Sequence, residues 1–156
     1  MRTYCTECGS TDLVADEAIP YEETVGAHTY FIDVPGVRCR ACGAFTLNAR
    51  VLEAIERVVA ESLVADRAWD GPAIRWIRKS LGWPAKEFAA LLGVAPETVS
   101  RWESGRQPPD RVMTLLLERL FRDELAGRDR TRRALEAEHQ AVHTTRSAAI
   151  DGNGLS

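Results

Sequence analysis

The residues best suited to chemistry in this chain are its four cysteines, which occur in two Cys-x-x-Cys-Gly segments. Two residues between the members of a pair let both thiolates reach one metal ion, and the following glycine permits a tight turn. Two such turns supply the four thiolates of a closed tetrahedral site, the ligand set of structural zinc. Two disulfides, a redox Cys-x-x-Cys or an iron–sulfur cluster are the alternatives. We predict one structural Zn²⁺ per chain, bound by Cys5, Cys8, Cys39 and Cys42.

The segment between the cysteine pairs has the pattern of a β-hairpin. Residues 13–23 and 28–38 are expected to be extended, because apolar side chains recur at every second position in the latter. Turns are predicted at Gly26 and at Pro35-Gly36. A β domain this small builds little core, so the metal is expected to supply a large share of its folding free energy.

Residues 83–110 carry the pattern of two short helices joined by a tight turn. Residues 86–92 place apolar side chains on one helical face, and Gly93 follows, where a left-handed backbone costs little. Pro96 suits the first turn of the second helix. A short rigid helix in this position has the shape that enters a DNA major groove, although an ordinary helical hairpin is the alternative.

The second helix of this pair is expected to have a buried and an exposed face. Val99 and Trp102 are three residues apart and turn inward together, which leaves a polar face outward. The guanidinium of Arg101 can donate two parallel hydrogen bonds to guanine, and a contact to phosphates alone is the alternative. The predicted DNA-contacting residues are Glu97, Thr98, Ser100 and Arg101 on this helix, with Lys86 and Arg106 on the flanking DNA backbone.

Three further helices are predicted, at 48–68, 74–81 and 110–125, with Asn48 and Asp110 as N-caps of the first and the last. Apolar residues at helical spacing mark the side of each helix that packs inward. The expected inward residues are Val51, Leu52, Ile55, Val58, Val59 and Leu63 in the first helix, Ile74, Ile77 and Leu81 in the second, and Val112, Leu116, Leu117 and Leu120 in the third.

Together these elements predict an α+β chain, with a small zinc-bound β domain followed by an all-α, five-helix helix-turn-helix domain. The β domain with its connecting helix is assigned to residues 1–68 and the helical domain to 70–126, because Asp70-Gly71-Pro72 is expected to break the chain. Residues 127–156 are expected to be a charged tail, with a helix at 128–142 and a disordered end at 144–156.

Composition and charge limit the possible functions. The chain is 45% hydrophobic and 28% charged, which describes a globular protein, and no apolar run approaches the roughly 18 residues of a membrane span. A cytoplasmic protein without a membrane partner is therefore predicted. Residues 1–69 hold 6 Arg and Lys against 11 Asp and Glu, so the first part of the chain is acidic. No enzyme is predicted, because the three histidines, at positions 28, 139 and 143, are scattered and no phosphate-binding glycine loop occurs. His28 is expected to be a hairpin residue rather than a metal ligand.

Residues 73–121 resemble the Xre/phage-repressor helix-turn-helix family. In that family a glutamate at the end of the recognition helix commonly pairs with an arginine of the first helix, which implies a structural ion pair between Glu103 and Arg78. A solvated surface position for Arg78 is the alternative. The residues that carry the resemblance are Phe88, Ala89, Gly93, Val94, Val99, Ser100, Arg101, Trp102, Glu103 and Gly105.

The chain as a whole resembles the MqsA-type antitoxin family over about residues 4–121. The matching segments are C-T-E-C-G, I-P-Y at 19–21, V-R-C-R-A-C-G, the amphipathic helix that follows, and V-S-R-W-E-S-G. One departure is Glu97, where the family has an amide that can read adenine.

The resemblance implies a homodimer formed through the C-terminal domain, which represses its own operon by binding a near-palindromic double-stranded operator. It also implies that the N-terminal domain neutralises a ribonuclease-type toxin of a type II toxin–antitoxin pair, and the net charge of −5 over residues 1–69 predicts that this partner is basic. A stand-alone Xre-family transcription regulator with a structural zinc domain is the alternative.

Overall fold

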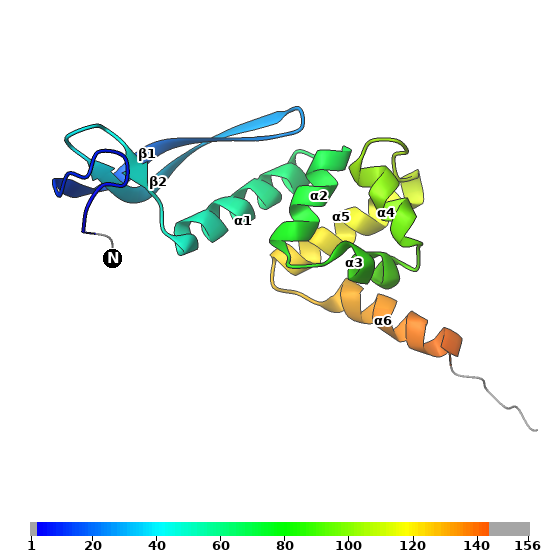
Figure 1. The fold of residues 1–156 in the computed structure, drawn as a ribbon. Helices are drawn as coiled ribbons and strands as arrows, with labels where there is room; N and C mark the ends of the chain where they lie inside the picture. The colour runs from blue at the N-terminus through cyan, green and yellow to red at the C-terminus, as the bar shows by residue number, and fades with distance from the viewer. Residues whose placement is uncertain (1–2, 144–156) are drawn as a thin grey trace, which may run out of the picture.

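The computed structural model describes residues 3–143, in which a small antiparallel sheet precedes six helices (Figure 1). The strands lie in the order β1-β2-β3, and the predicted α+β architecture is confirmed. The elements are β1 (Leu13–Val25), β2 (His28–Cys39), β3 (Phe45–Thr46), α1 (Ala49–Ala65), α2 (Gly71–Ser80), α3 (Ala85–Leu92), α4 (Pro96–Glu103), α5 (Arg111–Leu125) and α6 (Arg130–His143).

Strands β1 and β2 form a long hairpin that turns at Gly26, where φ is +60°. The predicted turn at Pro35-Gly36 is wrong, because both residues lie inside β2. Opposite Pro35 the pairing shifts between Asp16 and Ile19, so that a bulge in β1 faces the residue that has no N–H to donate. Pro35-Gly36 therefore stays within the strand, because the β1–β2 pairing is irregular at this point.

The hairpin has one buried and one exposed face. Ile19, Val25 and Val34 are at most 4% exposed and belong to the same core as the helices. On the other face the side chain of Phe31 is 79% exposed. Figure 1 shows the hairpin running along α1 and ending near the start of α2.

Contacts at the hairpin tip join it to the segment between α1 and α2. His28 Nε2 lies 2.7 Å from Asp70 Oδ2, and the hydroxyl of Tyr30 donates to Asp66 Oδ2 at 3.0 Å. The pKa of Tyr30 is raised to about 12, chiefly because its hydroxyl is partly buried and secondly because of this contact with Asp66. His28 is a hairpin residue, as predicted, and its role is to hold the tip against the first turn of α2.

Helix α1 begins as predicted, because Asn48 accepts a hydrogen bond from the N–H of Val51. Two residues expected in its inward stripe are exposed, Leu52 by 44% and Val58 by 43%. Leu52 lies in the first turn, before α1 reaches the other helices (Figure 1), and Val58 lies about 100° around the helix from the buried Val59. The buried residues of α1 are Ile55, Val59, Ala60, Leu63 and Val64.

The segment Asp70-Gly71-Pro72 begins a helix instead of breaking the chain. Asp70 accepts from the N–H of Ala73 as the N-cap of α2, and Pro72 occupies its first turn. Within 70–126 the structure has four helices, and α1 supplies the fifth to the same core. The predicted domain limits of 1–68, 70–126 and 127–156 stay a prediction.

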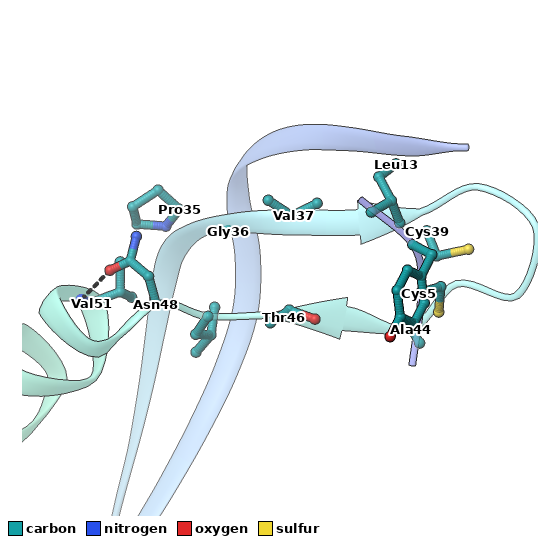
Figure 2. Close-up of a pocket in the computed structure, with 12 residues that line it drawn as sticks. Cys5, Leu13, Pro35, Gly36, Val37, Cys39, Ala44, Thr46, Asn48 and Val51 are labelled. Carbon is teal, nitrogen blue, oxygen red and sulfur yellow. Dashed lines mark hydrogen bonds between the residues drawn. The ribbon is translucent and has the colours of Figure 1, made fainter. Parts of the chain in front are cut away.

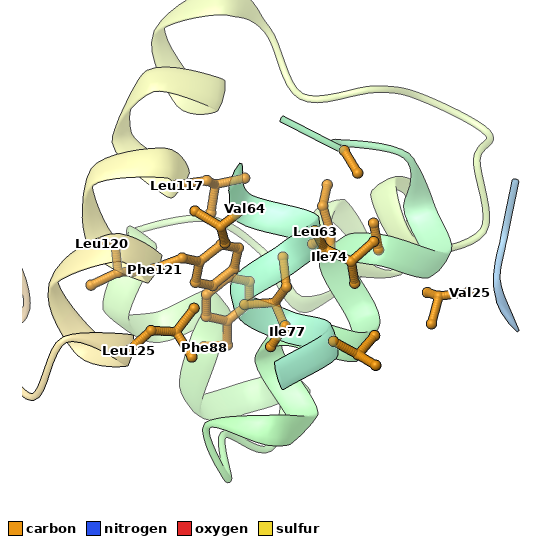
Figure 3. Close-up of a cluster of buried hydrophobic side chains, with 14 of the residues drawn as sticks. Val25, Leu63, Val64, Ile74, Ile77, Phe88, Leu117, Leu120, Phe121 and Leu125 are labelled. Atoms are coloured by element: carbon orange, nitrogen blue, oxygen red, sulfur yellow. The ribbon is translucent and has the colours of Figure 1, made fainter. Parts of the chain in front are cut away.

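The helical core is organised around stacked aromatic rings (Figure 3). Phe88 and Phe121 lie 5.8 Å apart with an interplanar angle of 11°, and Trp83 stacks on Phe88 at 5.7 Å. Val112, which was expected in the inward stripe of α5, is 76% exposed. It lies about 140° around the helix from the buried Leu117, so it faces away from the core.

The predicted helix at 128–142 is present as α6, which packs against α5 and α3. Asp123 of α5 is buried and accepts a hydrogen bond from the hydroxyl of Thr131 at 2.7 Å. That bond, together with the nearby Arg119 and Arg128, holds the pKa of Asp123 below its ordinary value. The predicted disordered end at 144–156 lies outside the described residues. No helix among residues 3–143 is long and apolar enough to cross a membrane.

Candidate metal centre and nucleic-acid interface

The four cysteines form one cluster, although the nearest members of the two pairs, Cys8 and Cys39, are 31 positions apart in the sequence. Their Sγ atoms all lie within 4.8 Å of one another, with Cys5 and Cys42 3.7 Å apart and Cys8 and Cys39 3.6 Å apart. Four sulfurs at 2.3 Å from a tetrahedral metal ion would be separated by roughly 3.8 Å. The arrangement therefore fits a single four-coordinate metal ion.

Two similar turns build this cluster from the sequence. The N–H of Gly9 donates to the carbonyl of Cys5 at 2.9 Å, and that of Gly43 donates to the carbonyl of Cys39 at 2.8 Å. Both glycines have positive φ, +72° and +78°, which explains why a glycine follows each pair. The turns point both thiols of a pair in the same direction.

Backbone N–H groups make one of the thiols a good ligand. The N–H of Cys42, and then that of Ala41, are directed at the sulfur of Cys39 and lower its pKa to about 7. A thiolate is the form that coordinates a metal. Four protein ligands complete a tetrahedral shell and leave no position for substrate, so the cluster suits a structural ion.

A cavity of about 610 Å³ lies beside the cluster (Figure 2). Apolar side chains line most of it, including Leu13, Val37 and Val51. The titratable groups in its wall are Cys5, Cys39 and Tyr4, so the cavity offers no acid–base pair apart from the cysteine cluster.

The second site is the pair of helices α3 and α4. Gly93 between them has φ +68°, the left-handed conformation that the sequence predicts. Val99 and Trp102 are buried, 0% and 4% exposed, and hold the inner face of α4 against the core. The outer face is left to polar side chains: Glu97, Ser100 and Arg101 are exposed and Thr98 is half-buried.

The residues predicted to flank this face are also accessible. Lys86 is exposed in the first turn of α3, and Arg106 is exposed in the loop after α4. Sequence reasoning passed over Arg75, which is exposed on α2 and lines a hollow of about 350 Å³ with Ser100 and Ser104 of the α4 segment. Arg75 could have been found from the sequence, because it lies one helical turn before Arg78 and so on the side of α2 that is near α4.

An ion pair fixes the end of α4 against α2. Arg78 Nε donates to Glu103 Oε1 at 2.6 Å, and Arg78 Nη2 donates to Oε2 at 3.2 Å. Arg78 Nη1 also donates to the carbonyl of Trp83 at 2.6 Å, just before α3 begins. The two charged side chains are 9% and 11% exposed. One guanidinium therefore joins α2, the start of α3 and the end of α4.

The start of α2 also lies very close to the end of α4. A Cβ on Gly71 would fall 2.5 Å from the carbonyl oxygens of Trp102 and Glu103. Only a glycine allows these two backbones to approach this closely, so α2 and α4 are held in one fixed orientation.

Residues 74–124 match the helix-turn-helix family, and this range runs from α2 almost to the end of α5. Residues 74–124 form an Xre-type helix-turn-helix domain. No curated protein matches the chain. The domain supports a DNA-binding regulator of the Xre family.

Proposed function

We propose that the protein is a sequence-specific repressor that binds double-stranded DNA through the outer face of α4. The observation that carries the proposal is the exposure of Glu97 and Arg101 on a helix whose other face is buried and whose end is held by the Arg78–Glu103 pair. A rigid helix presents its side chains to base edges with little loss of backbone conformational entropy on binding. No catalytic role is proposed, and a repressor of its own operon acts in the cytoplasm.

A homodimer formed through the C-terminal domain is part of this proposal. Val112 and Leu115 are 76% and 53% exposed, lie one turn apart on α5, and face away from the core. The same face on a second copy would cover them in a two-fold contact. Two copies of α4 about 34 Å apart would then read a near-palindromic operator.

Zinc is the metal we propose for the cysteine cluster. Cys5, Cys8, Cys39 and Cys42 would hold it, and four thiolates with this separation suit a tetrahedral d¹⁰ ion. These four residues come from the N-terminal turn and from the end of β2 with the turn after it, so holding one ion would tie these segments together and would stabilise the sheet.

We also propose an antitoxin role for the N-terminal part of the chain. The support is the family resemblance, the net charge of −5 over residues 1–69, and the outer face of the hairpin, where the exposed Phe31 lies opposite Glu22 in the β1–β2 register, with Asp33 also exposed. An aromatic side chain among carboxylates suits a basic protein partner such as a ribonuclease-type toxin. Co-purification of the chain with the product of the adjacent gene tests this role. A stand-alone regulator would purify without such a partner.

The repressor proposal is tested by DNA binding at fixed salt. Wild type is expected to prefer its own promoter over scrambled DNA. Arg101→Ala should weaken promoter binding by about 1–3 kcal/mol and reduce that preference. Arg50→Ala is the matched control, because it removes the same charge from an exposed position on α1.

Equal weakening of Arg101→Ala on both DNAs would reduce Arg101 to a phosphate contact. A wild-type protein without preference for its promoter would refute the repressor proposal.

A further inference from the structure

The exposed face of α4 presents a carboxylate and a guanidinium side by side. Glu97 and Arg101 are four residues apart, which places them about 40° apart around the helix and roughly 6 Å apart along it. Val99 and Trp102 point in the opposite direction, into the core. Glu97 and Arg101 therefore occupy the middle of the surface that α4 offers to a groove.

Neither side chain forms an ion pair or a hydrogen bond within the described part of the protein. Five other pairs at i, i+4 spacing form ion pairs on the described helices, among them Arg57–Glu61 and Arg133–Asp129. Glu97 and Arg101 have the same spacing, yet no ion pair or side-chain hydrogen bond joins them to each other or to another residue between 3 and 141. Both charges are thus available to a ligand.

The chemistry of the two groups selects different bases in the major groove. A guanidinium donates two hydrogen bonds to O6 and N7 of guanine. A carboxylate can only accept, and the N4 amino group is the donor that cytosine offers there. The N6 amino group of adenine lies beside the acceptor N7, which repels a carboxylate, and thymine and guanine present acceptors at this edge.

We propose that Glu97 and Arg101 set the operator sequence, and this inference rests on the proposed function as a sequence-specific repressor. Each half-site would contain a guanine read by Arg101 and a different base pair whose cytosine is read by Glu97. Because base pairs stack about 3.4 Å apart, the roughly 6 Å between the two side chains places these pairs within about two steps.

Glu97 has a possible structural role that the test must separate from base reading. It lies in the first turn of α4, where a carboxylate stabilises the helix through the positive end of its dipole. Glu87 occupies the first turn of α3 and is equally exposed. Glu87→Gln therefore removes the same charge from the same kind of helical position and is a matched control for Glu97→Gln.

The experiment is selection of bound sequences from randomised duplex DNA at one salt concentration, with full-length wild type, Glu97→Gln and Glu87→Gln. Wild type should enrich a two-fold motif with the two base pairs described above. In Glu97→Gln the cytosine position should change to adenine, because glutamine donates to N7 and accepts from N6 of that base. Glu87→Gln should enrich the wild-type motif.

A second measurement uses wild type alone and so does not depend on a variant that folds. Replacing the selected C·G pair by T·A turns a donor into an acceptor opposite the carboxylate, and binding should weaken by about five- to 100-fold.

The outcomes separate the two proposals. Enrichment of no motif by wild type overturns both the repressor function and this inference. A motif that lacks the cytosine, that is unchanged in Glu97→Gln, or that tolerates the T·A replacement overturns the inference and leaves the repressor function standing.

Discussion

Removal of the Arg78 side chain is a direct test of what holds α4, the helix that we propose to read DNA. Arg78→Ala would leave the carboxylate of Glu103 only 11% exposed and without its cation, and would leave the carbonyl of Trp83 without its donor. Breaking a fully buried pair from one side costs about 3–5 kcal/mol. Because water still reaches a small part of both side chains here, we expect a cost near the lower end of that range. For a chain of about 150 residues each kcal/mol lowers Tm by about 2–4 °C, so a fall of about 6–12 °C is expected.

The assay is thermal unfolding of the full-length protein followed by circular dichroism. Full length is necessary because α1 contributes Ile55, Val59 and Leu63 to the core that α2–α5 complete. Arg75→Ala, one turn earlier on α2 and exposed, is the control and should change stability by less than about 0.5 kcal/mol.

A double variant separates the loss of attraction from the burden of an unpaired charge. Arg78→Met combined with Glu103→Leu removes both charges, and most of the lost stability should return, because two apolar side chains have no desolvation cost. A Tm of Arg78→Ala equal to that of Arg75→Ala would refute the reasoning. A double variant as unstable as the single one would show that the geometry of the pair, and not its charge balance, is what matters.

Three further predictions concern the metal, the dimer and acid stability. Elemental analysis should find one zinc per chain, and Cys39→Ser should lose it while the helical circular dichroism signal remains, whereas iron in the wild type would exclude zinc. Val112→Glu combined with Leu115→Glu should shift the protein from dimer to monomer in analytical ultracentrifugation while the helical circular dichroism signal remains, since both side chains are exposed in a single chain; a dimer that persists would place the contact elsewhere. The pKa of Asp123 is lowered, first by the hydroxyl of Thr131, so its contribution to stability is present above the ordinary carboxyl pKa and is lost as pH falls through the lowered value. Asp123→Asn should therefore be less stable at pH 7 and lose less Tm between pH 5 and about pH 2 than wild type, and parallel Tm curves would contradict this.

Features encoded by neighbouring residues could be predicted from the sequence. The cysteine turns, Gly93 and the caps Asn48 and Asp110 each depend on a few consecutive residues, and the structure has them as expected. Their energetics are local, because a cap or a left-handed glycine acts within one turn.

Features that depend on distant partners could not be predicted in this way. Leu52 and Val112 have the type and approximate spacing of core residues, but no other element among residues 3–143 covers them. Pro35 is a turn former that lies in a strand because β1 bulges opposite it. The contact between His28 and Asp70 joins residues 42 apart, and neither residue has a local sequence signal for it. Burial and pairing at these positions are decided by tertiary packing.

The carboxylate of Asp70 connects the two parts of the molecule. One oxygen caps α2 by accepting from the N–H of Ala73, and the other binds His28 at the tip of the hairpin. At its far end the same hairpin finishes in Cys39, a predicted metal ligand. Because α2 carries Arg78, a continuous set of contacts runs from the cysteine cluster along β2, through Asp70 and α2, to Glu103 at the end of α4. The sheet therefore does more than end in a cysteine of the cluster, since the tip of its hairpin contacts the N-cap of α2, the helix against which Arg78 and Glu103 hold the end of α4.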